Sequence, residues 1–162
     1  MSDWLVTTGL SSVISIIILK NNGPLIHAPF DYQNYRLVYS LMAFYLSWDN
    51  PKTWDYVIHH NINILGICWC MWFDKYYKFM GRILMYEMTT PWLGMYMMTK
   101  NIYMTPMILL TYSYYRIYNN IELFIYWKEV DIVVCIVHLV NTFLNFYWYS
   151  KILRKCYIKL IQ

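Results

Sequence analysis

Charged residues are scarce in this chain. Of its 162 residues only 14% are charged, whereas 59% are hydrophobic and 20% are aromatic. A soluble domain usually carries about 25% charged residues and is less apolar. A chain of this composition cannot hide so much apolar surface from water by folding alone. The composition therefore argues against a soluble domain and predicts an all-α protein that crosses a membrane several times.

Motifs that define several common function classes are absent. The sequence has no glycine-rich phosphate loop, no nucleophile elbow and no nucleic-acid-binding motif. The net charge of +4 lies largely near the C-terminus and does not suggest a nucleic-acid partner. Internal repeats, low-complexity tracts and domain linkers are also lacking. We therefore expect one transmembrane domain over residues 1–162 and no nucleic acid as a partner.

Cysteine and histidine are few. Cys68 and Cys70 lack the spacing of zinc ligands and a nearby second pair. These two and Cys135 lie in apolar runs, where a cysteine packs as a small hydrophobic residue. The chain has only four histidines, and His27 lies in an expected loop. A di-iron lipid hydroxylase would need many clustered histidines, so we expect no metal site and no bound cofactor.

Apolar runs divide the chain into six predicted membrane helices, since spanning a bilayer takes about 20 apolar residues. The predicted spans cover residues 4–19, 35–48, 54–73, 79–98, 102–118 and 130–150. Pro91 is expected to kink the fourth span, and Asn119 and Asn120 are expected to break the helix after the fifth. Short connections predict antiparallel neighbours. Basic residues are nearly balanced between the two sides, so the orientation stays open.

Four of the six predicted spans carry a polar stripe, because residues three and four apart share a helix face. The stripes comprise Asp55, His59, Asn63, Gly66 and Cys70; Glu87, Thr90, Pro91 and Gly94; Tyr112 and Arg116; and His138, Asn141, Thr142 and Asn145. Ionisable groups at membrane depth normally face the bundle interior or a polar cavity. The stripes therefore predict a central polar cavity, although purely structural hydrogen bonds between helices would give the same pattern.

The adjacent histidines His59 and His60 favour a functional cavity over a structural role. Histidine can act as a general base, a general acid or a nucleophile, and Glu87 could orient an imidazole. We therefore take His59, His60 and Glu87 as candidate catalytic residues and expect a contact between Glu87 and a histidine. The candidate substrate-binding residues are Arg116, His138, Asn141 and Asn145. Arg116 could instead extend its guanidinium to the membrane interface.

The order of these segments resembles the TLC-domain family, multispan lipid proteins that include the ceramide synthases. Residues 54–60 resemble the histidine-pair segment of that family. Residues 86–93 are similar to the Glu-x-Ser/Thr-Thr/Ser-Pro-Phe-Leu segment of its members that are not ceramide synthases. Residues 115–117 resemble the arginine of the following span, and residues 144–149 with the basic tail resemble the last helix. The resemblance covers about residues 35–159.

The resemblance implies a protein that acts on or binds membrane lipids, in a membrane of the endoplasmic-reticulum type. One implied activity is ceramide-synthase-like transfer of an acyl group from acyl-CoA to a lipid amine. His59 or His60 would then be the base or the attacked imidazole. Residues 86–90 depart from the His-Asp-x-Ser-Asp segment of the ceramide synthases, and Ser40 replaces a frequent aspartate. These departures support the alternative, a non-enzymatic lipid-binding or lipid-regulating protein. The oligomeric state stays open.

Overall fold

The computed structural model describes residues 13, 32–48, 53–99 and 101–161. All regular secondary structure in these residues is helical, which confirms the predicted all-α class. The first predicted span, residues 4–19, lies outside the described residues, as does the loop that contains His27.

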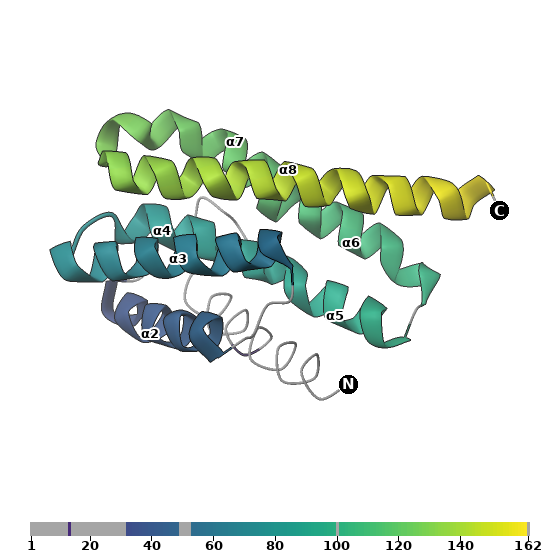
Figure 1. Ribbon diagram of the computed structural model, residues 1–162, viewed down its shortest axis with the longest axis horizontal. Coiled ribbons are helices and arrows are strands. Elements are labelled where there is room, and N and C mark those ends of the chain that lie inside the picture. The colour runs from purple at the N-terminus through teal and green to yellow at the C-terminus, as the bar shows by residue number, and fades with distance from the viewer. Residues whose placement is uncertain (1–12, 14–31, 49–52, 100, 162) are drawn as a thin grey trace.

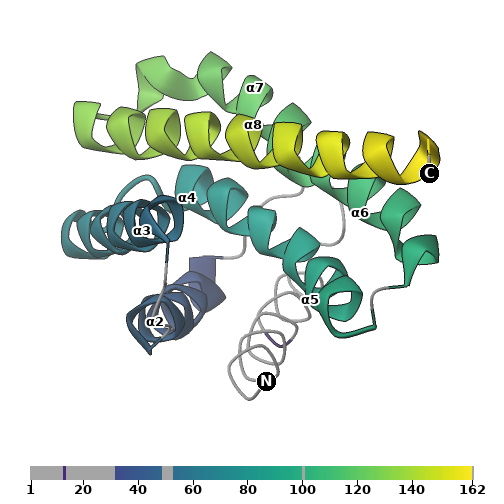
Figure 2. The same cartoon turned by 45° about the vertical axis from the view of Figure 1, so that its right-hand side comes forward.

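Three long helices form a stack. They are α2 (Tyr32–Trp48), α3 (Trp54–Phe73) and α8 (Ile132–Ile161). The middle helix, α3, packs against both α2 and α8, while α8 runs along the length of the molecule (Figure 1). The second view shows α8 above α3, with α2 below α3 (Figure 2). α3 has the boundaries predicted for the third span, so the helix that carries both histidines lies at the centre of the stack.

The remaining chain forms shorter helical segments. They are α4 (Tyr77–Leu84), η1 (Met85–Thr89), α5 (Thr90–Thr99), η2 (Ile102–Met104), α6 (Thr105–Tyr112), η3 (Ser113–Tyr118), α7 (Asn119–Leu123) and η4 (Phe124–Glu129). Two of them matter for the site: η1 is a 3₁₀ segment and η3 is a π-helical segment. These two irregular segments contact each other.

Pro91 explains the interruption of the fourth predicted span. Proline has no N–H, so the carbonyl of Glu87 loses its usual α-helical donor, and the proline ring crowds the preceding turn. The helix tightens into η1 just before this point and resumes as α5. The predicted disturbance near Pro91 is therefore observed. The tighter turn also changes which backbone carbonyl groups are available to side chains.

Two helix boundaries differ from the prediction. Asn119 and Asn120 do not break the helix, because α7 follows η3 directly at Asn119. Both side chains are fully buried, and their amides donate to the carbonyls of Arg82 and Arg116, respectively. The predicted basic tail after residue 150 continues α8 to Ile161. No glycine or proline follows residue 149, so nothing in the sequence there ends the helix.

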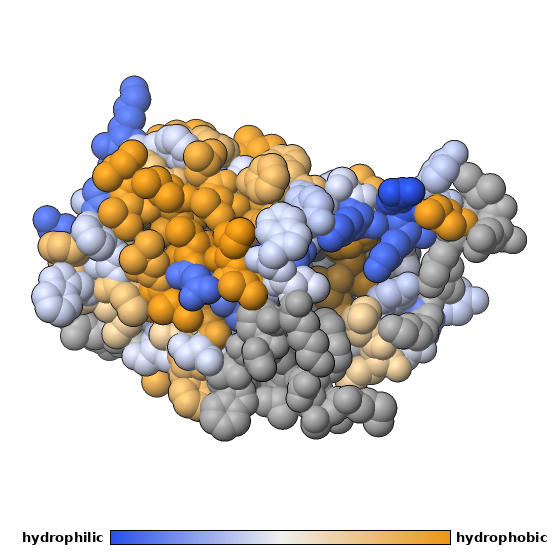
Figure 3. Space-filling model, in the orientation of Figure 1, coloured by the Kyte–Doolittle hydropathy of each residue, from blue (hydrophilic) through white to orange (hydrophobic). Residues whose placement is uncertain are grey.

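The fold places polar side chains inside and many large apolar side chains outside. On α8 the exposed residues include Ile132, Ile136, Leu139 and Phe143, whereas the opposite face buries the predicted polar stripe. Figure 3 shows a broad hydrophobic area over α3 and the first half of α8. Exposed apolar patches of this kind mark a membrane or a partner as the neighbour. The outer faces of α3 and α8 are thus apolar, while their buried faces combine polar residues with apolar ones such as Ile67, Val137 and Leu144.

One helix in the described part of the chain is long and apolar enough to cross a membrane. It is the stretch of α8 from Ile132 to Ile158, with a mean hydropathy of 1.5. The stretches predicted as spans 79–98 and 102–118 are each divided into shorter helices. Six uninterrupted membrane helices are therefore not confirmed.

Candidate functional site

All seven candidate site residues are buried. They are His59 and His60 in α3, Glu87 in η1, Arg116 in η3, and His138, Asn141 and Asn145 in α8. The predicted inward orientation of the polar stripes is therefore confirmed. The alternative in which Arg116 reaches the membrane interface is wrong, because only 5% of this residue is exposed. The catalytic and binding roles of these residues stay predictions.

A pair of asparagine amides joins α3 to α8. Asn63 Nδ2 donates to Asn141 Oδ1 and Asn141 Nδ2 donates to Asn63 Oδ1, both at 3.0 Å. The second hydrogen of each amide is also used. Asn63 donates it to the carbonyl of His59 at 2.7 Å, and Asn141 donates it to the carbonyl of Val137 at 3.0 Å. The pair thus satisfies all four of its N–H groups inside the protein.

This pair determines how the His59 imidazole is held. His59 Nδ1 lies 3.0 Å from both Asn141 Oδ1 and Asn63 Nδ2. Both hydrogens of Asn63 Nδ2 already have acceptors, so the contact that fits the hydrogen count is donation from Nδ1 to Asn141 Oδ1. In a neutral imidazole, a hydrogen on Nδ1 leaves the lone pair on Nε2. His59 therefore has a fixed ring and an unprotonated nitrogen, Nε2, on its other side.

Trp148 connects His59 to two charged residues. The indole Nε1 donates to Asp55 Oδ2 at 2.7 Å, and the ring meets the His59 ring edge-on with 5.2 Å between centroids. The guanidinium carbon of Arg116 lies 5.8 Å from the centre of the Trp148 ring. Lys151 Nζ approaches Asp55 at 3.8 Å from the exposed side. Asp55 and Trp148 were missed as site residues, although Asp55 belongs to a predicted stripe and Trp148 lies three residues after Asn145, at the end of another.

Arg116 is held by the interrupted fourth span and by α8. Its Nε lies 3.1 Å from the Tyr86 carbonyl and 2.6 Å from Thr89 Oγ1. Its Nη1 donates to Asn145 Oδ1 at 3.1 Å. The η1 segment thus supplies a backbone carbonyl and a hydroxyl that a regular α-helix would direct elsewhere. Seven side chains of α3, η3 and α8 thus lie together, and we refer to them as the His59–Arg116 cluster. They are Asp55, His59, Asn63, Arg116, Asn141, Asn145 and Trp148.

Glu87 borders this cluster through Thr90. Thr90 Oγ1 donates to Glu87 Oε2 at 2.9 Å and lies 3.4 Å from Arg116 Nη2. The hydroxyl therefore links the carboxylate to the guanidinium. The expected contact between Glu87 and a histidine stays a prediction. His60, the second histidine of the pair, faces α2, where its ring centroid lies 6.3 Å from that of Tyr45.

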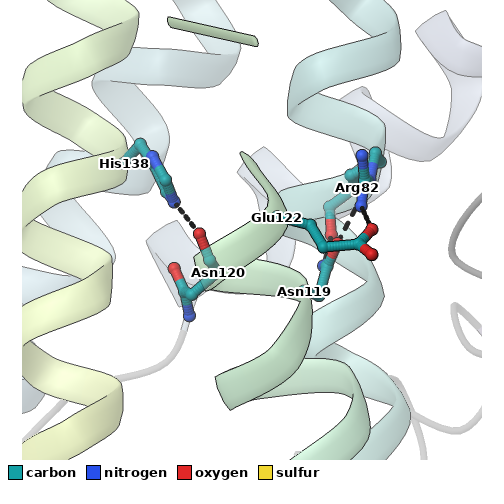
Figure 4. Close-up of polar contacts among 5 residues, drawn as sticks. All are labelled: Arg82, Asn119, Asn120, Glu122 and His138. Atoms are coloured by element: carbon teal, nitrogen blue, oxygen red, sulfur yellow. Dashed lines mark hydrogen bonds and ion pairs between the residues drawn. The ribbon is translucent and has the colours of Figure 1, made fainter. Parts of the chain in front are cut away.

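His138 lies in a polar group around Asn120, whose amide donates to the Arg116 carbonyl and so borders the His59–Arg116 cluster. Its Nδ1 accepts from Trp127 Nε1 at 2.6 Å, so its Nε2 donates to the carbonyl of Asn120 at 3.1 Å. Figure 4 shows this bond beside the ion pair of Arg82 and Glu122, whose atoms are 2.9 Å apart. Both ring nitrogens of His138 therefore have partners within the protein, and the contacts tie α8 to α7 and η4.

Among the described residues, no group of three His, Cys, Asp or Glu side chains is placed to hold a metal ion. Cys70 is buried as expected for a small packing residue, whereas Cys68 is exposed on α3. The exposure of Cys68 follows from its position two residues from Cys70, on another face of the helix.

Comparison of the chain with protein-family models, with curated proteins and with solved structures finds no match. The family resemblance therefore depends on the quoted segments alone.

Proposed function

We propose that this chain is a multi-pass membrane protein of the TLC type that acts on or binds membrane lipids at the His59–Arg116 cluster. The inverted arrangement of α3 and α8, with apolar residues outside and polar residues inside, supports a lipid environment. Interrupted spans fit that proposal where freed backbone groups find partners inside the protein. In η1, next to the interruption, the Tyr86 carbonyl accepts from both Arg116 and Thr89.

The segments that carry the family resemblance also supply the cluster. Residues 54–60 contribute Asp55 and His59, residues 115–117 contribute Arg116, and residues 144–149 contribute Asn145 and Trp148. Three segments that are distant in sequence thus contribute to one interior region. This convergence supports a shared site, and by resemblance the membrane would be of the endoplasmic-reticulum type.

The activity we propose is acyl transfer from acyl-CoA to a lipid amine. The observation that carries it is the contact between His59 Nδ1 and Asn141 Oδ1, which leaves Nε2 to act as the base. The amine nitrogen would bond to the thioester carbonyl carbon while Nε2 takes its proton. The carbon–sulfur bond would then break, and His59 would return the proton to the departing thiolate. An oriented base of this kind is a recurring element of acyl transfer.

The test is formation of an N-acylated lipid by the purified protein in liposomes. Acyl-CoA and a sphingoid base are supplied, and the product is measured by mass spectrometry. We expect product from the wild type, and loss of it in His59→Ala at an unchanged unfolding temperature. The matched control is Asn61→Ala, on the exposed side of the same helix. A folded wild type that forms no product would reject this acyl transfer, and full activity in His59→Ala would reject His59 as its base.

The second candidate function is lipid binding without chemistry. The contacts of residues 86–93 favour it, because this segment resembles family members other than ceramide synthases. The hydroxyls of Thr89 and Thr90 contact Arg116 rather than His59. Native mass spectrometry distinguishes the two candidates: an intact lipid that stays bound, unchanged after incubation with acyl-CoA, supports binding alone.

A further inference from the structure

Among the described residues, two arginines are largely buried, and they have different charge partners. Arg82 Nη2 lies 2.9 Å from the Glu122 carboxylate, so its charge is paired. Arg116 is more deeply buried, and within the described part of the chain no carboxylate lies at ion-pair distance from it. A buried charge without a counter-charge is costly. Arg116 therefore needs another source of negative charge.

The groups that hold Arg116 are uncharged. Its acceptors are the Tyr86 carbonyl, the hydroxyls of Thr89 and Thr90, and the Asn145 amide oxygen. They orient the guanidinium but do not neutralise it. Glu87 reaches Arg116 only through Thr90, so its carboxylate offsets the charge from a distance. The site can therefore accept an anion. The nearby carboxylate of Glu87 repels an anion and so limits the negative charge that the site can bind.

Asn145 supplies a second donor beside the guanidinium. Because Arg116 can only donate, the atom that faces Nη1 must be the amide oxygen. This fixes Nδ2 on the other side of the amide, where it is buried and has no hydrogen-bond partner among the described residues. Only 1% of Asn145 is exposed, so water does not readily replace the missing acceptor. A buried orphaned donor of this kind calls for an explanation, such as a ligand.

The local fold supports the same assignment. The guanidinium lies where the 3₁₀ segment η1 meets the π-helical segment η3. Single π-helical turns are often found at functional sites. The guanidinium carbon also lies 5.2 Å from the Tyr112 ring and 5.8 Å from the Trp148 ring. An anion that reaches Arg116 must therefore lose its hydration in a buried, aromatic setting. An attached apolar chain offsets that cost by its own burial, which a free ion lacks.

We propose that Arg116 and Asn145 Nδ2 bind the oxyanion of a lipid, either a carboxylate or a phosphate ester. The inference rests on the proposed lipid function and adds the chemistry of the head group. A guanidinium and an amide N–H are suitable donors to either oxyanion. Oleate and oleoyl-lysophosphatidate are the lipid probes, oleyl alcohol is the uncharged probe with the same chain, and inorganic phosphate is the probe without a chain.

The experiment measures binding of each probe to the purified, delipidated full-length protein by the shift of its unfolding temperature. We expect at least one of the two anionic lipids to stabilise the wild type, while oleyl alcohol and inorganic phosphate do not. Equal stabilisation by oleyl alcohol would overturn the inference, because the anion would then be irrelevant. Stabilisation by inorganic phosphate at the same concentrations would overturn the assignment to a lipid.

Two variants locate the binding. Arg116→Gln should weaken binding of the anionic lipid by about tenfold or more, given the strength of charged hydrogen bonds. Asn145→Asp should abolish it while raising the unfolding temperature of the lipid-free protein, because the new carboxylate would pair with Arg116. An Asn145→Asp protein that unfolds earlier or fails to fold counts against an unpaired Arg116. The control Arg82→Gln, Glu122→Gln removes a paired arginine and should leave binding in place.

The result of the lipid-binding experiment can be distinguished from the result of the acyl-transfer experiment. His59→Ala should still bind the anionic lipid, since the donors to the oxyanion are on η3 and α8. Binding that depends on Arg116 in a protein without acyltransferase activity supports the inference and rejects the enzyme. A different outcome would reject the anion site but keep the acyl transfer. In that outcome Arg116→Gln transfers the acyl group at the wild-type rate, and neither protein is stabilised by an anionic lipid.

Discussion

At the scale of single residues, the amide pair of Asn63 and Asn141 is the feature that most closely joins stability to function. Each amide donates a hydrogen bond to the other, and the Asn141 oxygen also accepts a hydrogen bond from His59 Nδ1. Removal of one asparagine leaves the other amide buried with missing partners, which costs more than removal of both. The His59 orientation, by contrast, needs Asn141 whatever the state of Asn63.

This difference gives a prediction for leucine substitutions. Asn141→Leu should lower the free energy of unfolding by about 1–3 kcal/mol, because it orphans the Asn63 amide. Asn63→Leu, Asn141→Leu should regain most of that loss, since two leucines can pack where the amides met. Neither protein should support the reaction assigned to His59. Unfolding in detergent and product formation are measured on both proteins and on Asn61→Ala as control. A double variant as unstable as Asn141→Leu would contradict the argument.

At the scale of secondary-structure elements, the parts predicted from sequence are those that depend on local patterns. The bounds of α3 and its buried face follow from apolar length and from the spacing of Asp55, His59 and Asn63. The interruption before Pro91 follows from the missing N–H. The continuation of the helix through Asn119 and Asn120 could not be predicted, because it depends on tertiary partners. They are the Arg82 carbonyl for Asn119 and the hydroxyls of Tyr86 and Thr142 for Asn120.

The same limit explains the missed site residues. Asp55 and Trp148 are 93 positions apart, and neither residue alone indicates the bond between them. The stripes correctly predicted which faces are buried, but not which partners meet there. The seven candidates were grouped as one cavity, whereas both ring nitrogens of His138 contact Asn120 and Trp127 rather than another candidate. Periodicity thus fixes orientation around a helix axis, while the pairing of helices requires the tertiary structure.

Gly66 allows a prediction about the packing of α3 against α8. A β-carbon at this position would lie 3.0 Å from Val137 Cγ1 and 3.2 Å from Met80 Cε. Gly66→Ala should therefore destabilise the fold by about 1–3 kcal/mol through overpacking. Gly66→Ala, Val137→Ala should be more stable than Gly66→Ala alone, because the smaller side chain on α8 restores the space. Val137→Ala by itself is the control and should also destabilise, since it leaves a cavity. Strict additivity of the two changes would contradict direct contact.

At the scale of the whole molecule, the distribution of polar and apolar residues carries the membrane proposal. Hydrogen-bonded asparagines, histidines and arginines occupy the interior, while Leu139 and Phe143 are among the apolar residues on the outer face of α8. In water this arrangement would expose the surface that folding normally buries. In a bilayer the same surface faces lipid, and most of the interior polar groups described above bond to one another. The environment therefore determines whether this fold is favourable.

Accessibility of spin labels on α8 tests that environment directly. Labels at positions 139 and 143 of a cysteine-free protein in liposomes should collide frequently with oxygen and rarely with a water-soluble nickel chelate. A label at position 155, where Lys155 is exposed beyond the predicted span, should show more contact with the chelate. The physical reason is that oxygen concentrates in the hydrocarbon region, whereas a charged chelate is excluded from it. Equal chelate contact at positions 139 and 155 would place the outer face of α8 in water. Low contact with both reagents at 139 would place it against protein, and either result would contradict a lipid-facing α8.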